Sequence, residues 1–405
     1  MQSHTTKNKF CIRPFTDADI RTSGKLRTCC EIQPNLSKFK GQTNFNVKEG
    51  FDKFWNSPYR KYLIDSFLND KKLDECKNCW MREAKNLESH REAGNRKHKI
   101  LFKKNYEKHI KQLNKWNLES PQDMTFAITN LCNLKCQMCK GMFSSPLLNE
   151  NLALGFEKNI SQKDFDWDKG TKINFIKNLL KHDLKHLTIL GGEPFIVPEI
   201  VKILAELSKK IKVVDEIDLT IFSNGTNCNL TMYNILKQFK HLKLIISMDS
   251  THKNNDYVRY PSDWNLIKEN IKLFKKMPYV ELMINATVQN LTILYLDRLI
   301  NFAYENEIHL ILYPISEPTY LQFDNLPVSV LEKSLKKLSK IKKERTIHVT
   351  NFDNLLALLE DKISNGHTTN VKEYDKFVTM IKARDKYRNI SIKNYMPELA
   401  QELFK

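Results

Sequence analysis

The sequence lacks the long hydrophobic segments of a membrane protein. No apolar run in its 405 residues approaches the roughly 18 residues that a membrane-spanning helix requires. The N-terminal MQSHTTKNKF lacks the apolar core of a secretory signal peptide, and repeats and long low-complexity segments are absent too. From these absences we expect a cytoplasmic protein with no membrane partner.

Acidic residues are outnumbered by basic ones. The chain has 47 Asp and Glu against 65 Lys and Arg, which gives a net charge of +18. Such an excess can indicate a nucleic-acid or acidic-peptide partner. Lysine supplies most of it, however, and is spread along the whole chain, often beside asparagine, as an AT-rich genome would also produce. We therefore favour compositional bias over a dedicated binding face, since solvated lysine is the usual surface residue.

Most of the cysteines are clustered. Without a secretion signal, such clusters favour metal or redox chemistry over disulfides. Cys228 lies apart from the rest and is expected to be a small buried hydrophobe. The clustered cysteines are Cys11, Cys29, Cys30, Cys76, Cys79, Cys132, Cys136 and Cys139.

The run TNLCNLKCQMCK has the spacing of a metal site with an open position. Cys132, Cys136 and Cys139 are four and three residues apart, so their thiolates can wrap one face of an iron–sulfur cube. Such clusters normally take four protein cysteines. No fourth lies nearby, so one iron would keep an open position, as a catalytic metal site does. A zinc knuckle or unrelated thiols are the alternatives.

From residue 124 onward, short β-branched apolar runs alternate with amphipathic helical segments at 173–184 and 199–211. In the second segment one apolar face is expected to contain Ile200, Ile203, Leu204, Leu207 and Ile211. The alternation predicts parallel strands joined by right-handed crossovers. Six units make an α/β fold, a partial (βα)6 TIM-like barrel with its chemistry at the carboxyl ends of the strands. The predicted strands are 124–129, 184–190, 216–222, 242–248, 280–288 and 308–315.

A GGEP turn follows the second predicted strand. Gly191 and Gly192 lack a Cβ and tolerate unusual dihedrals, so the backbone there can approach a ligand closely. Glu193 can accept hydrogen bonds from a cationic amine. Taken alone the turn is a weak signal, and an ordinary strand-to-helix loop is the alternative.

The three cysteines, followed one βα unit later by GGEP, resemble the CxxxCxxC and GGE motifs of radical S-adenosylmethionine (SAM) enzymes. The resemblance implies a radical SAM barrel with a 4Fe–4S cluster on Cys132, Cys136 and Cys139. It also implies that the open iron of this cluster binds SAM through its amino and carboxylate groups. The methionine amino group would be held by the GGE residues, Gly191, Gly192 and Glu193.

Polar residues of the third to fifth strands extend the resemblance. In related enzymes a serine at the end of the fourth strand contacts SAM, and an arginine further along pairs with its carboxylate; Ser247 and Arg259 match these positions. Asn224 and Asp249 are weaker candidates for the ribose or the substrate, and Asn285 is a candidate contact of the adenosyl part. An ordinary surface salt bridge is the alternative for Arg259.

One position departs from the family pattern. Many members carry an aromatic residue before the third cysteine, beside the adenine, whereas this chain has Met138. Methionine is polarizable and can still cover the face of a base. Met138 therefore remains a candidate SAM contact.

The N-terminal cysteines show a second pattern. Cys11 is followed by twelve residues, Gly24, four residues and Cys29, and a CxxC pair lies further on. This is similar to the first half of a SPASM or twitch domain, although such domains usually follow the barrel and the later Cx5Cx3C of a full SPASM domain is absent. The resemblance implies a second, auxiliary 4Fe–4S cluster ligated by Cys11, Cys29, Cys76 and Cys79.

Two points in this N-terminal pattern stay open. Cys30 adjoins Cys29 and could replace it as a ligand. A structural zinc site with four cysteine ligands is the alternative to the auxiliary cluster.

These features divide the chain into four parts. Residues 1–92 form the auxiliary domain, with turns and one helix at 58–68, and residues 119–325 form the barrel. Residues 93–118 form a basic connector, read as a solvated helix with a nucleic-acid channel as the alternative. Residues 326–405 form an all-helical extension. The connector is expected to pack through Ile100, Tyr106, Ile110 and Leu113, and the extension through Leu331, Leu335, Leu338 and Ile341.

The resemblance implies a radical SAM oxidoreductase of the maturase type. Such an enzyme reductively cleaves SAM to a 5′-deoxyadenosyl radical, which abstracts hydrogen from the substrate. A peptide or protein is the first choice of substrate, with a flavodoxin or ferredoxin as reductant. A nucleoside or RNA is the second choice, and a non-catalytic iron–sulfur or zinc binding module is the alternative from another class. Rim candidates for a substrate base are Asp256, Tyr257, Tyr313 and Glu317.

Overall fold

The computed structural model describes residues 9–84, 88–102, 120–344, 349–366 and 368–404. The chain divides into two compact units, each of which is described by itself. The first unit contains residues 1–129, 161–191 and 216–219, and the second contains 130–160, 192–215 and 220–405. The division into four domains stays a prediction.

The first unit contains a mixed sheet whose strands follow the order β3-β2-β1-β4-β5. Strand β4 is parallel to both of its neighbours, and Asp123 pairs with Asp17 on one side and with His186 on the other. The three N-terminal strands correct the expectation of turns and one helix in this region. They are two to four residues long, too short for an alternating pattern to be recognised. The bounds are β1 (Asp17–Ile20), β2 (Lys25–Arg27), β3 (Phe45–Asn46), β4 (Asp123–Phe126) and β5 (His186–Ile189).

Helix α3 (Pro58–Leu68) forms where the sequence predicts it. Its first turn begins with Pro58, and the Ser57 hydroxyl accepts from the backbone N–H of Arg60, as in a capped N-terminus. The predicted packing residues of the connector, Ile100, Tyr106, Ile110 and Leu113, lie outside the side chains that the structure describes. The other helices of this unit are α1 (Arg13–Thr16), α2 (Phe51–Trp55), α4 (Lys77–Glu83), α5 (His90–Phe102) and α8 (Lys169–Leu179).

The second unit contains strands in the order β6-β7-β8-β9-β10, of which β7 to β10 pair in parallel. A strand is found at each of the six predicted runs, counting β4 and β5 of the first unit. The pair Val349–Thr350 forms a short strand beside β9, which corrects the expectation of an all-helical extension. The bounds are β6 (Asp218–Ser223), β7 (Leu242–Ser247), β8 (Val280–Val288), β9 (His309–Pro314) and β10 (Val349–Thr350).

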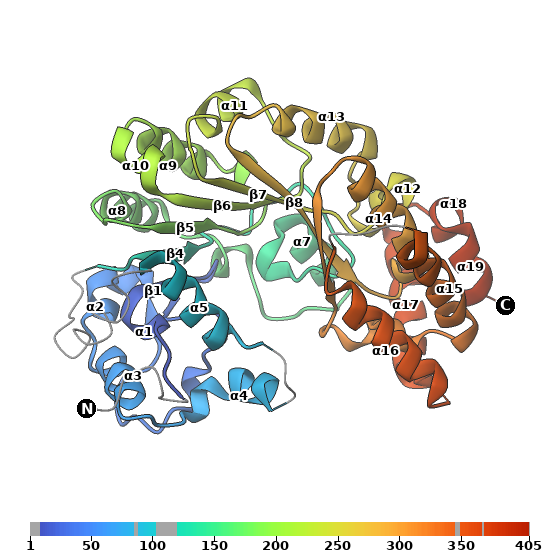
Figure 1. Cartoon of the computed structure of the whole chain (residues 1–405), viewed down its shortest axis with the longest axis horizontal. Helices are drawn as coiled ribbons and strands as arrows, with labels where there is room; N and C mark the ends of the chain where they lie inside the picture. The colour runs from blue at the N-terminus through green and yellow to red at the C-terminus, as the bar shows by residue number, and fades with distance from the viewer. Residues whose placement is uncertain (1–8, 85–87, 103–119, 345–348, 367, 405) are drawn as a thin grey trace. The chain divides into compact units, whose positions relative to one another are not determined.

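Amphipathic helices cover these strands, with α9, α11 and α13 on one side of β6 to β8 (Figure 1). In α9 four of the five predicted face residues are buried, but Ile211 is 78% exposed because the helix ends at Ser208. The helices are α7 (Ser145–Ala153), α9 (Pro198–Ser208), α10 (Ile211–Glu216), α11 (Leu230–Leu236), α12 (His252–Val258), α13 (Trp264–Lys275) and α14 (Leu296–Glu305).

The C-terminal region is helical apart from β10. In α15 the predicted stripe is buried at Leu331, Leu338 and Ile341 and half-buried at Leu335. The fold is therefore α/β with a mostly parallel sheet and a helical C-terminal region, as predicted. Among the described helices, none combines the length and the hydropathy that crossing a bilayer requires. The last helices are α15 (Val328–Glu344), α16 (Phe352–Ser364), α17 (Val371–Arg388), α18 (Ile392–Tyr395) and α19 (Pro397–Leu403).

Candidate iron–sulfur and SAM site

The three barrel cysteines lie on the loop between β4 and α7, in the second unit. Backbone bonds hold this loop, since the N–H of Lys135 donates to the carbonyl of Tyr260 at 2.5 Å and that of Gln137 to Val258 at 2.8 Å. The N–H of Leu134 donates to the Cys132 sulfur at 3.4 Å. The loop is therefore shaped by its own backbone and by the segment that follows α12.

The three thiols are close enough for their charges to interact. Burial first, and then Cys136 and Cys139, raise the pKa of Cys132. Burial and Cys136 raise the pKa of Cys139 to about 12. Thiols in this environment become thiolates when a bound metal displaces their protons. Among the described residues, the groups spaced for a single ion do not include these three.

Helix α17, in the C-terminal region, forms hydrogen bonds with the cysteine loop. The Arg384 guanidinium donates to the backbone carbonyl of Gln137 at 2.8 Å and to its side-chain oxygen at 2.9 Å. The Arg388 guanidinium donates to the carbonyl of Lys135 at 2.7 Å. Both carbonyls belong to residues that flank Cys136, so the C-terminal extension is part of this site.

Next to the cysteine loop, basic side chains outnumber acidic ones. Glu150 of α7, with 0% of its surface exposed, is 2.7 Å from Arg388, 3.2 Å from Lys135 and 3.6 Å from Arg384. One carboxylate thus faces three cations. Buried charge is costly unless it is compensated.

This excess of positive charge fits an anionic group on the loop. Nε of Arg384 and Nη1 of Arg388 are buried without a hydrogen-bond acceptor. The charges of Arg259 and Arg388 oppose the rise in the pKa of Cys136 that burial causes. A 4Fe–4S cube that carries three thiolates is anionic overall, so the residues present fit such a cluster.

The GGE turn packs against the cysteine loop. A Cβ on Gly192 would lie 1.9 Å from the carbonyl oxygen of Leu131, and the N–H of Glu193 donates to that oxygen at 2.9 Å. Gly191 has a φ of +137°, in the region that favours glycine. Glycine was predicted here to let the backbone approach a ligand; in the structure the close approach of Gly192 is to the residue before Cys132.

Glu193 joins the GGE turn to the SNGT loop, residues 223–226, which begins with the last residue of β6. It is fully buried, and its carboxylate accepts from the N–H of Asn224 at 2.6 Å, the hydroxyl of Ser223 at 2.9 Å and the N–H of Phe195 at 3.1 Å. Burial raises the pKa of Glu193 to about 7, against the lowering effect of these donors. The carboxylate is thus fixed in place and titrates near neutral pH.

Asn224 links the SNGT loop to the cysteine loop. Its side-chain amide donates to Asn133 at 2.9 Å, and the Asn133 amide donates to the Thr226 hydroxyl at 2.8 Å. Asn133 and Thr226 were not singled out from the sequence. The sequence did offer an indication of their roles, because Asn133 lies within the cysteine motif TNLCNLKC and Thr226 lies within SNGT.

The structure pairs Arg259 with Asp249, at 2.8 Å between Nε and Oδ2. The other oxygen of Asp249 accepts from the N–H of Thr287 at 2.7 Å, and Nη1 of Arg259 lies 3.9 Å from the Cys136 sulfur. Arg259 is 8% exposed, so the alternative of an ordinary surface salt bridge is wrong. The predicted carboxylate-binding arginine is thereby brought beside the predicted cluster.

The remaining predicted SAM contacts are half-buried. Ser247, the last residue of β7, is the register partner of Asn285, which lies within β8, and Met138 lies in the cysteine loop. Their placement agrees with a site at the carboxyl ends of the strands, while their individual roles stay predictions.

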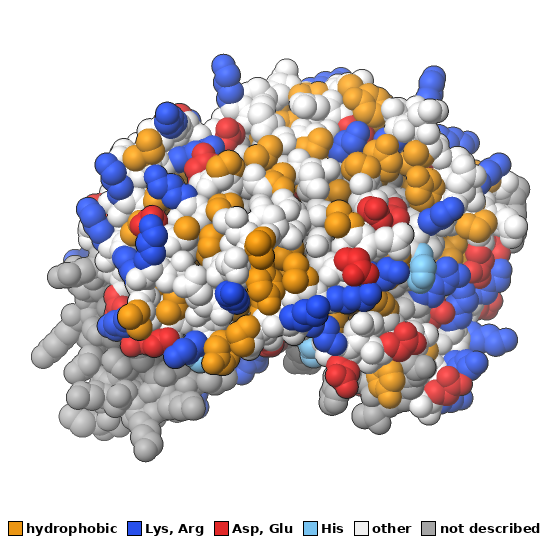
Figure 2. Space-filling model, turned by 90° about the horizontal axis from the view of Figure 1, so that it is seen from above, with side chains coloured by type: hydrophobic (Ala, Val, Ile, Leu, Met, Phe, Trp, Pro, Cys, Tyr) orange, Lys and Arg blue, Asp and Glu red, His pale blue; other side chains and the backbone are white. Residues whose placement is uncertain are grey.

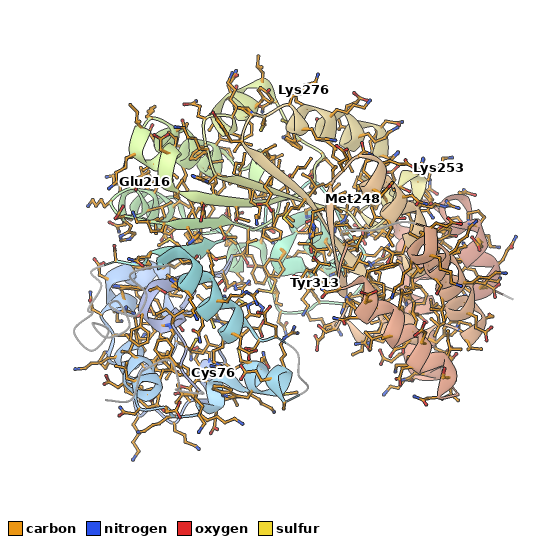
Figure 3. The ribbon with its side chains drawn as sticks, in the orientation of Figure 1. Cys76, Glu216, Met248, Lys253, Lys276 and Tyr313 are labelled. Atoms are coloured by element: carbon orange, nitrogen blue, oxygen red, sulfur yellow. The ribbon has the colours of Figure 1, made fainter. Side chains whose placement is uncertain are left out.

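The four rim candidates for a substrate base differ in environment. Tyr257 is fully buried, and its hydroxyl donates to Asp385 at 2.7 Å, which makes it a structural tie to α17. Burial raises the pKa of Asp256 to about 6. Glu317 forms an exposed ion pair with Lys140, and Tyr313, near the end of β9, is 54% exposed (Figure 3).

The N-terminal cysteines gather within the first unit. Burial first, and then the charges of Cys11, Cys29 and Cys79, raise the pKa of Cys76, which lies just before α4 (Figure 3). Cys30 adjoins this group, since its charge raises the pKa of Cys29. After burial, Asp19 and Glu31 are the main causes that raise the pKa of Cys30 itself, to about 11. Cys228, expected to be buried, is half-buried.

The basic residues do not form a continuous patch on the face shown in Figure 2. Among the described residues on that face, Lys and Arg side chains are scattered between acidic and apolar ones.

A cavity of about 540 Å³ lies in the first unit next to the CxxC pair, lined by Leu36, Lys72, Asp74, Lys77, Trp80, Met81 and Ala84. Its volume is within the range of small-ligand pockets.

Comparisons with solved structures give remote likenesses. SuiB of Streptococcus suis, bound to the precursor peptide SuiA, is 19% identical with a TM-score of 0.40, over 61% of this chain and 52% of its own. The anSMEcpe protein with bound AdoMet is 20% identical with a TM-score of 0.41, over 61% of this chain and 67% of its own. This chain thus spans about half the length of SuiB. Both TM-scores are below 0.5.

Sequence comparison is more specific about one segment. No curated protein matches the chain. The family model described as Radical SAM superfamily matches residues 126–302. That segment contains the three barrel cysteines, the GGE turn, Arg259 and Asn285. The match covers less than half of the chain, and it is a similarity of this segment to the Radical SAM superfamily.

Proposed function

We propose that the protein is a radical SAM enzyme whose 4Fe–4S cluster is held by Cys132, Cys136 and Cys139. When bound, such a cluster supplies one electron that cleaves SAM to methionine and a 5′-deoxyadenosyl radical, which takes a hydrogen atom from the substrate. The observation that carries the proposal is the loop itself: it carries three thiols, and it is held by cations that share a single carboxylate. A structural zinc site, in contrast, is closed by four protein ligands.

The surrounding residues of the chain would bind and orient SAM. Arg259, already beside Cys136, would direct its guanidinium to the SAM carboxylate while Asp249 keeps it in position. Glu193 would accept from the amino group with the lone pairs that its three donors leave free. The proposed contacts are Met138, Gly191, Gly192, Glu193, Asn224, Ser247, Asp249, Arg259 and Asn285.

Replacement of Cys132, Cys136 and Cys139 by alanine tests this function. We expect dithionite-driven formation of 5′-deoxyadenosine by the anaerobically reconstituted enzyme to fall to background, together with a loss of about four irons per chain. Cys228→Ala is the matched control and should leave both quantities unchanged. Undiminished 5′-deoxyadenosine formation in the triple variant would refute the proposal.

We further propose that Cys11, Cys29, Cys76 and Cys79 hold an auxiliary 4Fe–4S cluster that takes the second electron from a substrate radical or anchors the substrate. The mutual influence of their charges supports this ligand set. Metal analysis of the anaerobically purified protein should find about eight irons per chain. About four irons and one zinc would contradict the second cluster.

The substrate proposed is a peptide or protein. The support is the resemblance of the N-terminal cysteines to SPASM and twitch domains, whose bearers often modify peptides. A ferredoxin or flavodoxin would deliver the electron. Mass spectrometry of the neighbouring gene products, co-expressed with the intact or the cysteine-less protein, should find a mass change that depends on the cysteines; an unchanged peptide pool would count against this substrate.

The pKa of Glu193 predicts a pH effect on stability. Its folded-state pKa of about 7 exceeds the ordinary value of 4.5, so the folded state binds the proton more tightly. The protonated Glu193 carboxyl therefore contributes up to about 3 kcal/mol to the free energy of unfolding. This contribution is fully present below pH 4.5 and is lost as the pH rises through 7. Chemical denaturation at several pH values should show a smaller loss of unfolding free energy from pH 5 to 8 in Glu193→Gln. Equal slopes in both proteins would contradict this prediction.

A further inference from the structure

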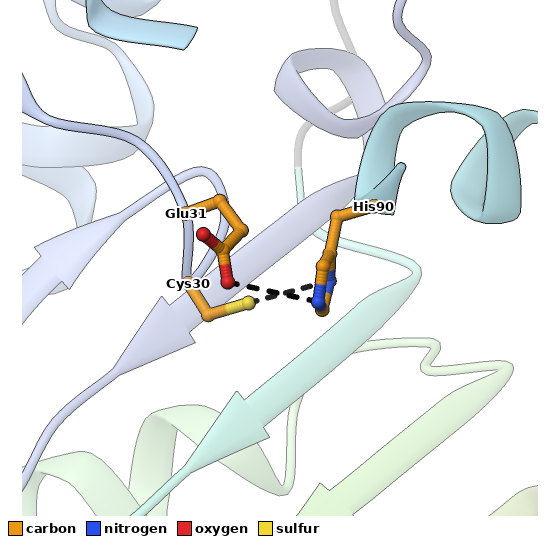
Figure 4. A group of neighbouring side chains, drawn as sticks. All are labelled: Cys30, Glu31 and His90. Carbon is orange, nitrogen blue, oxygen red and sulfur yellow. Dashed lines mark hydrogen bonds and ion pairs between the residues drawn. The ribbon is translucent and has the colours of Figure 1, made fainter. Parts of the chain in front are cut away.

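A second group of side chains of metal-ligating types lies in the first unit, and it adjoins the four-cysteine set through the sequence neighbours Cys29 and Cys30. Cys30 and Glu31 follow β2, and His90 is the first residue of α5. The Cys30 sulfur lies 3.5 Å from Nδ1 of His90, and Oε1 of Glu31 lies 3.6 Å from Nε2 (Figure 4). One ligand atom from each residue lies within 4.8 Å of the other two. Segments 60 residues apart thus bring sulfur, nitrogen and oxygen donors together.

A second such group in the described chain needs no ion to explain it. Asp17, His98 and Asp123 also lie within 4.8 Å of one another, but all three are buried. Asp17 pairs with Arg13 and Asp123 pairs with Lys97, so the two carboxylates already have cations. That group is a structural tie between α5 and the strands β1 and β4.

The group of Cys30, Glu31 and His90 differs from this one in its hydrogen bonding and its exposure. The Asn78 amide donates to Oε2 of Glu31 at 2.9 Å, which orients the carboxylate and leaves Oε1 facing the imidazole. The side chains of His90 and Glu31 are 46% and 30% exposed, so an ion there would be open to solvent on one side. Metal-binding carboxylates are commonly held in this way by a second hydrogen bond.

The spacing of the sulfur and Nδ1 donors fits a tetrahedral metal ion. Zinc–sulfur and zinc–nitrogen bonds of about 2.3 and 2.1 Å place the two donors about 3.6 Å apart. The distance from Cys30 Sγ to His90 Nδ1 is 3.5 Å. A thiolate and a carboxylate together neutralise a divalent cation, and a neutral imidazole completes three ligands.

We propose that Cys30, Glu31 and His90 bind one Zn²⁺ ion with its fourth position open to water or to an incoming thiolate or carboxylate. Cys30 is then a ligand of this ion and does not replace Cys29 in the four-cysteine set. Three protein ligands and one open position are the arrangement of catalytic zinc sites, whereas structural sites are closed. The proposal does not depend on the radical SAM activity.

Isothermal titration of the anaerobically reconstituted full-length protein with Zn²⁺ tests the site. We expect about one ion to bind per chain, with the affinity reduced more than about tenfold in Cys30→Ser and in His90→Ala. Glu31→Gln, which keeps size and shape, should weaken binding by a similar factor. Cys228→Ser and His241→Ala, each at a position outside the group, are the matched controls and should bind as the wild type does.

Iron analysis of the same samples separates this site from the iron–sulfur sites. The proposal expects the iron content of Cys30→Ser, Glu31→Gln and His90→Ala to equal that of the wild type. Zinc affinity unchanged by all three substitutions would overturn it. A loss of about four irons in Cys30→Ser would also overturn it, because Cys30 would then ligate the auxiliary cluster.

Discussion

Glu150→Gln is expected to lower the unfolding free energy by about 3–5 kcal/mol. The substitution keeps the size of the side chain but removes the carboxylate shared by Lys135, Arg384 and Arg388. The two buried guanidiniums and the half-buried Lys135 would then lose the carboxylate that they share, and the bonds from α17 to the cysteine loop would be strained by their repulsion. Chemical denaturation of wild type and variant measures the effect.

A second substitution distinguishes unpaired charge from lost packing as the cause of this loss of stability. If unpaired charge causes the loss, Arg388→Gln introduced with Glu150→Gln should be less destabilising than the sum of the two single changes. Glu206→Gln, at an exposed ion pair with Lys209, is the control and should leave the denaturation midpoint unchanged. A loss below about 1 kcal/mol in Glu150→Gln, or strict additivity in the double variant, would contradict the shared role of Glu150.

Gly192→Ala is the other substitution with a large expected effect. The added Cβ would lie 1.9 Å from the carbonyl oxygen of Leu131 and 2.4 Å from its carbonyl carbon, so backbone rather than a flexible side chain must move. Displacement would break the bond from Glu193 to Leu131, next to Cys132. We expect a destabilisation of about 1–3 kcal/mol or more and a marked loss of iron from the barrel site.

Gly170→Ala is the matched control for this substitution. Gly170 lies in the first turn of α8, where the nearest atom to an added Cβ is a carboxylate oxygen of Asp168 at 3.3 Å. Alanine favours helix over glycine, so stability should be unchanged or slightly higher and the iron content unaffected. Wild-type iron and stability in Gly192→Ala would show that the cysteine loop does not depend on this contact.

The strands and the rim of the site could be predicted because both are local in sequence. Each strand from β4 to β9 is a short apolar run, and the cysteines, the GGE turn and Arg259 lie on or shortly after such runs. Parallel strands bring their carboxyl ends to one edge, so position along the chain is enough to place these residues. The pairing of Arg259 with Asp249 could not be read in this way, because it depends on side-chain direction.

The contribution of the C-terminal extension could not be predicted. Arg384 and Gln137 are 247 residues apart, and Arg388 and Glu150 are 238 apart. Within its own helix each arginine looks like a solvated cation of a basic chain, since α17 carries several lysines. Only tertiary packing distinguishes the two buried guanidiniums from the exposed ones. The strands β1 to β3 were missed because they are only two to four residues long, and β1 is in addition buried throughout and shows no alternation.

The central claim is that Cys132, Cys136 and Cys139 hold a cluster with one iron open to SAM. The most direct measurement is the electron paramagnetic resonance spectrum of the dithionite-reduced protein before and after addition of SAM, with the triple alanine variant as background. A reduced 4Fe–4S signal that depends on these cysteines and changes when SAM is added is the predicted result. A cysteine-dependent signal that SAM leaves unchanged, or no such signal at all, would contradict the account.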